Sequence, residues 1–104
     1  MDALDLWVSG EGEYHTYRIP ALLSTGDETI LAFCEGRKHG RSDAGEIDLL
    51  LRRSEDAGAT WSATSVVVSE SEKTCGNPCP VYDAQTGSVV LLFCKNIGEV
   101  AEAE

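Results

Sequence analysis

The sequence lacks any long apolar run and is short of positive charge. No stretch approaches the roughly 18 consecutive apolar residues that a transmembrane helix needs, so we expect no membrane span. Eight lysines and arginines stand against 18 acidic residues, which gives a formal net charge of −10. Because the phosphates of nucleic acid demand a basic surface, this balance argues against nucleic-acid binding.

Two kinds of signal are also missing. Residues 1–6 have neither the basic n-region nor the apolar h-region of a secretory signal, so we expect a cytoplasmic protein, or a chain whose signal was removed or never included. Cys75 and Cys79 are four positions apart and have no matching pair or nearby histidine. We therefore expect no metal, no cofactor and no disulfide framework. Cys34 and Cys94 each end an apolar run, which is typical of buried free thiols.

What the sequence does contain is an internal repeat with a period of sixty residues. Four identical pairs align without a gap: Pro20 with Pro80, Leu31 with Leu91, Phe33 with Phe93 and Cys34 with Cys94. Self-similarity at a fixed period is the signature of repeat architectures such as solenoids and propellers.

The local signals within each repeat are those of β-strands. Gly26-Asp27 and Thr86-Gly87 separate short apolar runs, as turns in hairpins do, and no window has a sustained helical period. We predict strands near 17–24, 29–34, 46–54, 60–68, 78–82 and 88–94. Four strands followed by two that restart the pattern predict an all-β fold, the antiparallel strands of a β-propeller, with about one and a half blades present. A six-stranded sandwich or partial barrel is the alternative; it has no reason to repeat at this register.

A turn motif follows the third predicted strand. Residues 54–61 have the form Ser-x-Asp-x-Gly-x-Thr-Trp, in which Asp56 can accept hydrogen bonds from the backbone of its own turn. Gly58 supplies a positive φ, and Trp61 is a large apolar anchor under the turn. We interpret Ser54, Asp56, Gly58 and Trp61 as structural residues.

This motif is similar to the Asp-box of the sialidase (neuraminidase) family, and the resemblance extends from about Tyr14 to Asn96. Tyr17-Arg18-Ile19-Pro20 resembles the family's Tyr/Phe-Arg-Ile-Pro signature, and Glu35-Gly36-Arg37 its Phe-x-Glu-Gly-Arg segment. Asp43 resembles the family's loop aspartate, and residues 76–81 resemble the segment that opens the second blade. By the order of these motifs the chain resembles an exo-α-sialidase, and we expect it to be an N-terminal piece of one.

The resemblance implies a six-bladed propeller and a division of the chain. Residues 1–96 are expected to be the N-terminal part of the propeller, with blade one at about 14–70 and the start of blade two at about 75–96. Residues 97–104 are expected to be an acidic tail or truncation point. The implied partners are sialylated glycans, whether glycoproteins, glycolipids or oligosaccharides.

The resemblance also implies roles for three residues in retaining hydrolysis of terminal α-ketosidic sialic acids. Arg18 is expected to bind the sialic acid carboxylate, for which a planar guanidinium is well suited, and Arg37 to lie beside it. Asp43 is expected to be the general acid/base, with Asp48 as a rival in the same stretch. The family's tyrosine nucleophile, its glutamate partner and two further arginines have no match here, so we expect the 104 residues alone to be inactive.

A second interpretation comes from a different class of protein. A non-catalytic Asp-box β-repeat or carbohydrate-binding module would need the turn motif for its scaffold. It would not need both Arg18 and Asp43, and these two residues therefore favour the enzyme.

Overall fold

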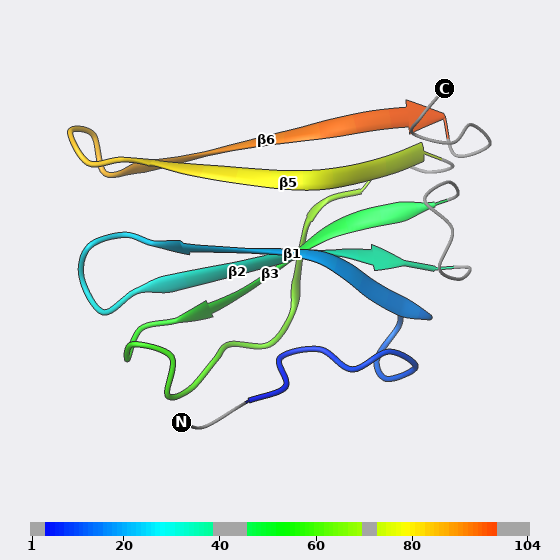
Figure 1. Cartoon of the computed structure of the whole chain (residues 1–104), viewed down its shortest axis with the longest axis horizontal. Helices are drawn as coiled ribbons and strands as arrows, with labels where there is room; N and C mark the ends of the chain where they lie inside the picture. Colours follow the sequence, from blue (N-terminus) through cyan, green and yellow to red (C-terminus); the bar gives the residue numbers. More distant parts are fainter. Residues whose placement is uncertain (1–3, 39–45, 70–72, 98–104) are drawn as a thin grey trace.

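The computed structural model describes residues 4–38, 46–69 and 73–97 and consists of six β-strands (Figure 1). They are β1 (Thr16–Ser24), β2 (Ile30–Arg37), β3 (Ile47–Ser54), β4 (Ser65–Val68), β5 (Lys73–Asp83) and β6 (Ser88–Ile97). The six predicted strands are therefore confirmed. No residue in the described ranges is helical, and accordingly none belongs to a helix that could cross a membrane.

Strands β2 and β6 each end three residues later than predicted, at 37 and 97. Two other strands begin five residues away from the prediction, each for a local reason. Strand β4 begins at 65 rather than 60, because bends and turns occupy residues 55–60 and residues 61–64 precede the regular ladder; within them the Ser62 N–H donates to the Arg53 carbonyl at 2.8 Å. Strand β5 begins at 73 rather than 78, because a bulge between Gly76 and Cys79 accommodates Pro78 inside the strand. A proline cannot donate to a sheet ladder, and a bulge is one of the few places in a strand that tolerates it.

The strands form one complete antiparallel sheet and one hairpin. Strands β1, β2, β3 and β4 pair in that order, each antiparallel to the next. Strands β5 and β6 pair antiparallel and lie as a second layer against the first sheet (Figure 1). One parallel pair of residues, Ile47 of β3 and Thr74 of β5, joins the hairpin to the four-stranded sheet.

One face of the four-stranded sheet is covered by the segment that precedes β1. Tyr14 packs with Cys34 and Leu50 in a buried cluster. Trp7 and Tyr17 pack against that cluster and stack on each other, with ring centroids 6.3 Å apart. The segment is also tied down by polar contacts, because the Trp7 indole N–H donates to the Thr64 hydroxyl at 3.0 Å and an Arg52 N–H donates to the Leu6 carbonyl.

The opposite face of the same sheet, which we call the inner face, is covered by the β5–β6 hairpin. Cross-strand partners point to the same side of a sheet, and the register places Phe33 with Leu51 and Glu35 with Leu49 on this face. A hydrogen bond from the Asn77 N–H to Glu35 crosses from β5 to β2 at 2.8 Å. Strand β2 is therefore buried on both sides, from Leu31 to Arg37.

The internal repeat is real, but its register differs from the one that the sequence predicted. The β1–β2 pairing has a bulge between Arg18 and Ala21, and the β5–β6 pairing has one between Gly76 and Cys79. When the bulges are superimposed, Ile19-Pro20 corresponds to Asn77-Pro78, an offset of 58, and Phe33 corresponds to Leu92, an offset of 59. Ile19 and Asn77 even share a φ of 55°. The gapless sixty-residue alignment of Pro20 with Pro80 and Phe33 with Phe93 was wrong, because it ignored the bulges.

The hairpin has one face that the described chain leaves uncovered, which we call the outer face. By register it carries Val81 with Val90 and Cys79 with Leu92, and Cys94 lies next along β6. Val81, Val90 and Leu92 are about half exposed or more, and both cysteines are exposed. The prediction that Cys94 is a core thiol was therefore wrong for the described chain, whereas Cys34 is buried.

Candidate functional site

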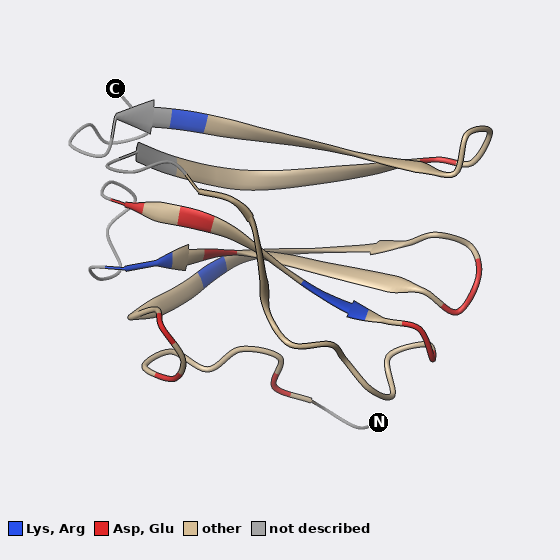
Figure 2. Ribbon diagram, turned by 180° about the vertical axis from the view of Figure 1, so that it is seen from behind, with Lys and Arg blue, Asp and Glu red and all other residues tan. Residues whose placement is uncertain are grey.

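Three strand ends meet at one end of the first sheet, which we call the arginine end. Strand β1 begins there at Thr16, which pairs with Arg37 at the end of β2, and Arg37 pairs with Ile47 at the start of β3. Figure 2 shows acidic and basic segments close together at this end. Of the three residues that sequence reasoning assigned to substrate, Arg18 and Arg37 lie here. Asp43 lies outside the described residues.

Arg18 occupies an exposed position on β1, just before a distortion of the strand. Its register partner on β2 is Glu35, and together with Ser9, Thr16 and Tyr17 it lines a shallow surface depression. The next residue, Ile19, has a φ of 55°, which is a costly conformation for a β-branched side chain. Such strain persists only where the surrounding structure fixes it, and it is common at functional sites.

Arg37 differs from Arg18 because it is almost fully buried, with 2% of its surface exposed. Its Nε and Nη2 atoms both donate to Glu35 Oε1, at 3.0 and 2.5 Å. A guanidinium that donates two hydrogen bonds to one carboxylate is oriented as well as neutralised. Arg37 is thus paired with the glutamate of its own Glu-Gly-Arg motif.

A second polar cluster lies on the other face of the sheet at the same end. The buried Tyr14 hydroxyl donates to Asp48 Oδ2 at 2.7 Å, and Lys38 Nζ lies 3.6 Å from the same oxygen and 2.7 Å from Glu46. Burial and the bond to Asp48 raise the pKa of the Tyr14 hydroxyl. Asp48 is buried, and its partner Tyr14 could not be predicted from the sequence, because the two residues are 34 positions apart.

Gly36 separates the two clusters and allows both to pack. A Cβ atom at this position would lie 2.7 Å from side-chain carbons of both Tyr14 and Leu50. That approach is closer than van der Waals contact permits, so only glycine fits between Glu35 and Arg37. The Glu-Gly-Arg motif therefore has a packing requirement as well as two charged groups.

The Asp-box turn lies at the opposite end of β3, eight residues from the arginine end or roughly 25 Å at the rise of an extended strand. Asp56 Oδ1 accepts from the Thr60 N–H and the Ser54 hydroxyl, both at 2.8 Å, and the Thr60 hydroxyl donates to Oδ2. These bonds, those from Thr60 above all, lower the pKa of Asp56 to about 2. Gly58 has a φ of 97°, and its carbonyl accepts from the Trp61 indole.

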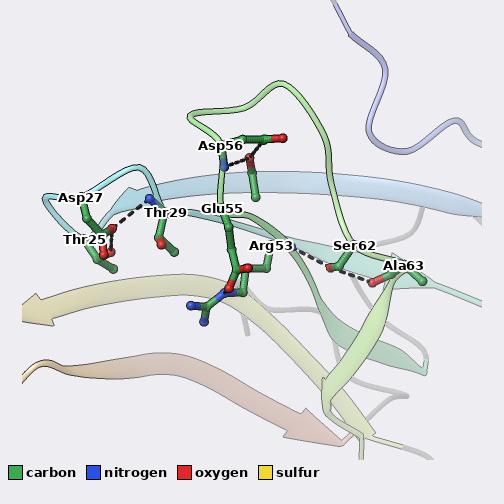
Figure 3. Close-up of polar contacts among 9 residues, drawn as sticks. Thr25, Asp27, Thr29, Arg53, Glu55, Asp56, Ser62 and Ala63 are labelled. Carbon is green, nitrogen blue, oxygen red and sulfur yellow. Dashed lines mark hydrogen bonds and ion pairs between the residues drawn. The ribbon is translucent and has the colours of Figure 1, made fainter.

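The turn between β1 and β2 supports the Asp-box from the side. Asp27 Oδ1 accepts from the Thr29 N–H and the Thr25 hydroxyl, at 2.8 and 2.9 Å (Figure 3). The Ala57 N–H donates to the Glu28 carbonyl at 2.8 Å and joins the two turns. This end of the sheet is thus closed by contacts among turn residues, and every group that bonds to Asp56 belongs to its own turn.

Comparisons with known proteins agree on one family. No family model matches the chain. An exo-alpha-sialidase of Arthroderma benhamiae is 35% identical over 98% of the chain and 26% of the relative. Human Sialidase-4 is 41% identical over 85% of the chain and 19% of the relative. The chain thus spans about a quarter or less of the length of these curated relatives.

A solved structure shows the same fold. The chain superimposes on the Hadza microbial sialidase Hz136 with a TM-score of 0.77 over 86% of the chain and 19% of that protein, at 24% identity. The prediction of antiparallel propeller strands, one blade and the beginning of a second, is confirmed by this likeness and by the six strands. The predicted domain limits and the roles of the site residues stay predictions.

Proposed function

Because the chain belongs to the sialidase family, we propose that it forms one sector of an exo-α-sialidase that removes terminal sialic acids from glycans with retention of configuration. The observation that carries the proposal is the pair of arginines at the arginine end. Arg18 is exposed there, and Arg37 is held by Glu35 beside it. A scaffold repeat would need the Asp-box at the far end but not this pair.

Arg18 is the proposed ligand of the sialic acid carboxylate. A planar carboxylate is bound best by a guanidinium that offers two parallel donors. The bulge after Arg18 and the positive φ of Ile19 fix the backbone that carries it. Arg37 is proposed to lie behind the same site, where its buried charge and its pairing with Glu35 make it a fixed rather than a mobile contact.

Asp43 is the proposed general acid/base. The acid must reach the glycosidic oxygen within hydrogen-bond distance. Its rival Asp48 is 2% exposed and already accepts from the Tyr14 hydroxyl, so it is poorly placed to approach a bound sugar. This burial supports Asp43 over Asp48.

Tyr14 and Tyr17 do not suit the family's nucleophile role, which requires easy ionisation. The Tyr14 hydroxyl donates to a carboxylate and the Tyr17 hydroxyl donates to the Glu11 carbonyl at 2.6 Å. Burial raises the pKa of both phenols, the opposite of what a nucleophile needs. We therefore propose that the nucleophile comes from a part of the propeller beyond these residues.

The test is a chimera in which this chain replaces the matching segment of human Sialidase-4. Arg18→Ala should lower kcat/KM for a sialoside by roughly 2–4 kcal/mol of transition-state binding, and Arg18→Lys should recover little of it. The control is Arg53→Lys, which changes an exposed arginine at the Asp-box end and should leave kcat/KM unchanged. If Arg18→Lys behaves like the unsubstituted chimera, the carboxylate assignment is wrong.

A second arm of the same experiment addresses Asp43. Asp43→Asn should impair a natural sialoside more than an aryl sialoside, because a phenol leaves without protonation. Equal losses on both substrates would remove Asp43 from the acid/base role.

A further inference from the structure

Glu35 is a buried carboxylate whose two oxygens serve different parts of the molecule. It is 1% exposed. Oε1 accepts from Arg37 Nε and Nη2, at 3.0 and 2.5 Å, whereas Oε2 accepts from the Asn77 N–H on β5 at 2.8 Å. One side chain therefore joins an arginine of the candidate site to the backbone of the next blade.

The Asn77 N–H is available for this bond because of the bulge in β5. The pairing of β5 with β6 passes from Gly76 directly to Cys79, so Asn77 takes no place in that register. Its φ of 55° turns the backbone out of the regular ladder, a conformation that asparagine adopts more readily than most residues. The carboxylate on β2 then supplies the acceptor that the ladder does not.

We propose that Glu35 is a positioning residue: it fixes the Arg37 guanidinium relative to the start of the second blade. Residues of both blades then form one rigid side of the candidate substrate site. This proposal rests on the proposed function, because that function supplies the ligand toward which Arg37 would be positioned.

The chemistry of the three donors explains why this residue is a glutamate. The groups that contact Glu35 are the guanidinium N–H groups of Arg37 and the backbone N–H of Asn77, and an ionised carboxylate offers acceptors on both oxygens. A glutamine has one oxygen and one NH₂ group. Whichever way the amide is turned, its NH₂ group would face either Asn77 or Arg37, both of which are donors. An aspartate has both oxygens but is one methylene shorter, which takes its carboxylate away from groups on two different strands.

The first measurement uses the 104-residue chain, labelled with ¹⁵N. In Glu35→Gln the amide oxygen should stay with Arg37, and the Asn77 amide should exchange with solvent roughly tenfold faster or more, as expected for the loss of a hydrogen bond to a charged acceptor. The Arg37 Nε–H signal should also shift. The matched control is Glu55→Gln, because Glu55 pairs with Arg53 two residues away on an exposed surface. The control should move neither signal.

The second measurement places Glu35→Gln and Glu55→Gln in the sialidase chimera, and it decides the question if the isolated variant does not fold. Loss of positioning should raise KM for a sialoside roughly tenfold. A purely structural defect would instead lower the amount of active enzyme and leave KM unchanged.

The outcomes separate the two proposals. An unchanged Asn77 exchange rate, or an unchanged KM, in Glu35→Gln overturns the positioning role. If Asn77 and Arg37 respond as expected but Arg18→Lys in the chimera costs nothing, the contact stands as described and the proposed function fails.

Discussion

The inner face of blade one and the outer face of the hairpin are the same face of the repeat, yet one is buried and the other is exposed. Phe33 is 3% exposed and its counterpart Leu92 is 58% exposed; Leu31 is 7% exposed and its counterpart Val90 is 51% exposed. The amino-acid pattern is apolar in both places. The difference is coverage, because β5 lies against the first face and no described element lies against the second.

This contrast shows what the apolar pattern encodes. Each hairpin is built to be covered on a face by the hairpin that follows it, which is how a repeat array buries a continuous core. Strand β6 also pairs only with β5 within the described residues, and an unpaired edge beside an apolar face favours association. The inner face of blade one is therefore buried, whereas the hairpin keeps an apolar face that no described residue covers.

The largest expected effect comes from truncating matched residues on the two faces. Phe33→Ala should lower the free energy of unfolding by about 3–5 kcal/mol, the usual cost of removing a buried aromatic ring. Leu92→Ala should change it by no more than about 0.5 kcal/mol, because the side chain is already in solvent. Urea unfolding of both variants measures this, and equal costs would show that the outer face is covered. In the sialidase chimera the cost of Leu92→Ala should rise.

A smaller effect concerns the turns that close blade one. The pKa of Asp56 is lowered from 3.8 to about 2 by its bonds to Thr60 and Ser54. A carboxyl whose pKa is depressed by folding stabilises the fold above its unfolded pKa, and this contribution is lost as the pH falls through the folded pKa. Thermal melts between pH 4 and pH 2 should therefore fall more steeply for the unsubstituted chain than for Asp56→Asn. Parallel curves would contradict the role of these bonds.

The smallest effect is a difference in thiol reactivity. Cys79 and Cys94 are exposed on the hairpin, whereas Cys34 and Cys75 are buried. Burial also raises the pKa of the Cys34 thiol to about 12, with a contribution from Glu35, and so suppresses its reactive thiolate. A thiol reagent should modify the two exposed cysteines of the native chain first and the buried two only on unfolding. In the chimera, protection of Cys79 and Cys94 would indicate that a further blade covers the outer face.

Much of the fold was predictable from sequence, because turn residues and alternating apolar runs are local signals. They located all six strands and the Asp-box turn. The register of the repeat was not predictable in the same way, since a bulge adds residues to one strand without changing its apolar pattern. Only the pairing of Gly76 and Cys79 with β6 reveals that Pro20 corresponds to Pro78.

The site was predictable where a short motif carries it and not where distant residues meet. Arg18 and Arg37 could be singled out from their motifs. The bond from Tyr14 to Asp48 joins residues 34 positions apart, and the bond from Asn77 to Glu35 joins residues 42 apart. An aspartate inside an apolar run, such as Asp48, is a signal for such a network, because a buried charge needs a partner. That signal does not name tyrosine as the partner.

Turnover of a fluorogenic sialoside by the 104-residue chain alone is the most direct test of whether the chain carries only part of a sialidase site. We propose that this chain carries one side of a sialic acid site, with Arg18, Arg37 and Asp43, and that Tyr14 and Tyr17 are unsuited to act as the nucleophile. We expect no turnover by the isolated chain and measurable turnover by the chimera with human Sialidase-4 under the same conditions. Turnover by the isolated chain would contradict this proposal.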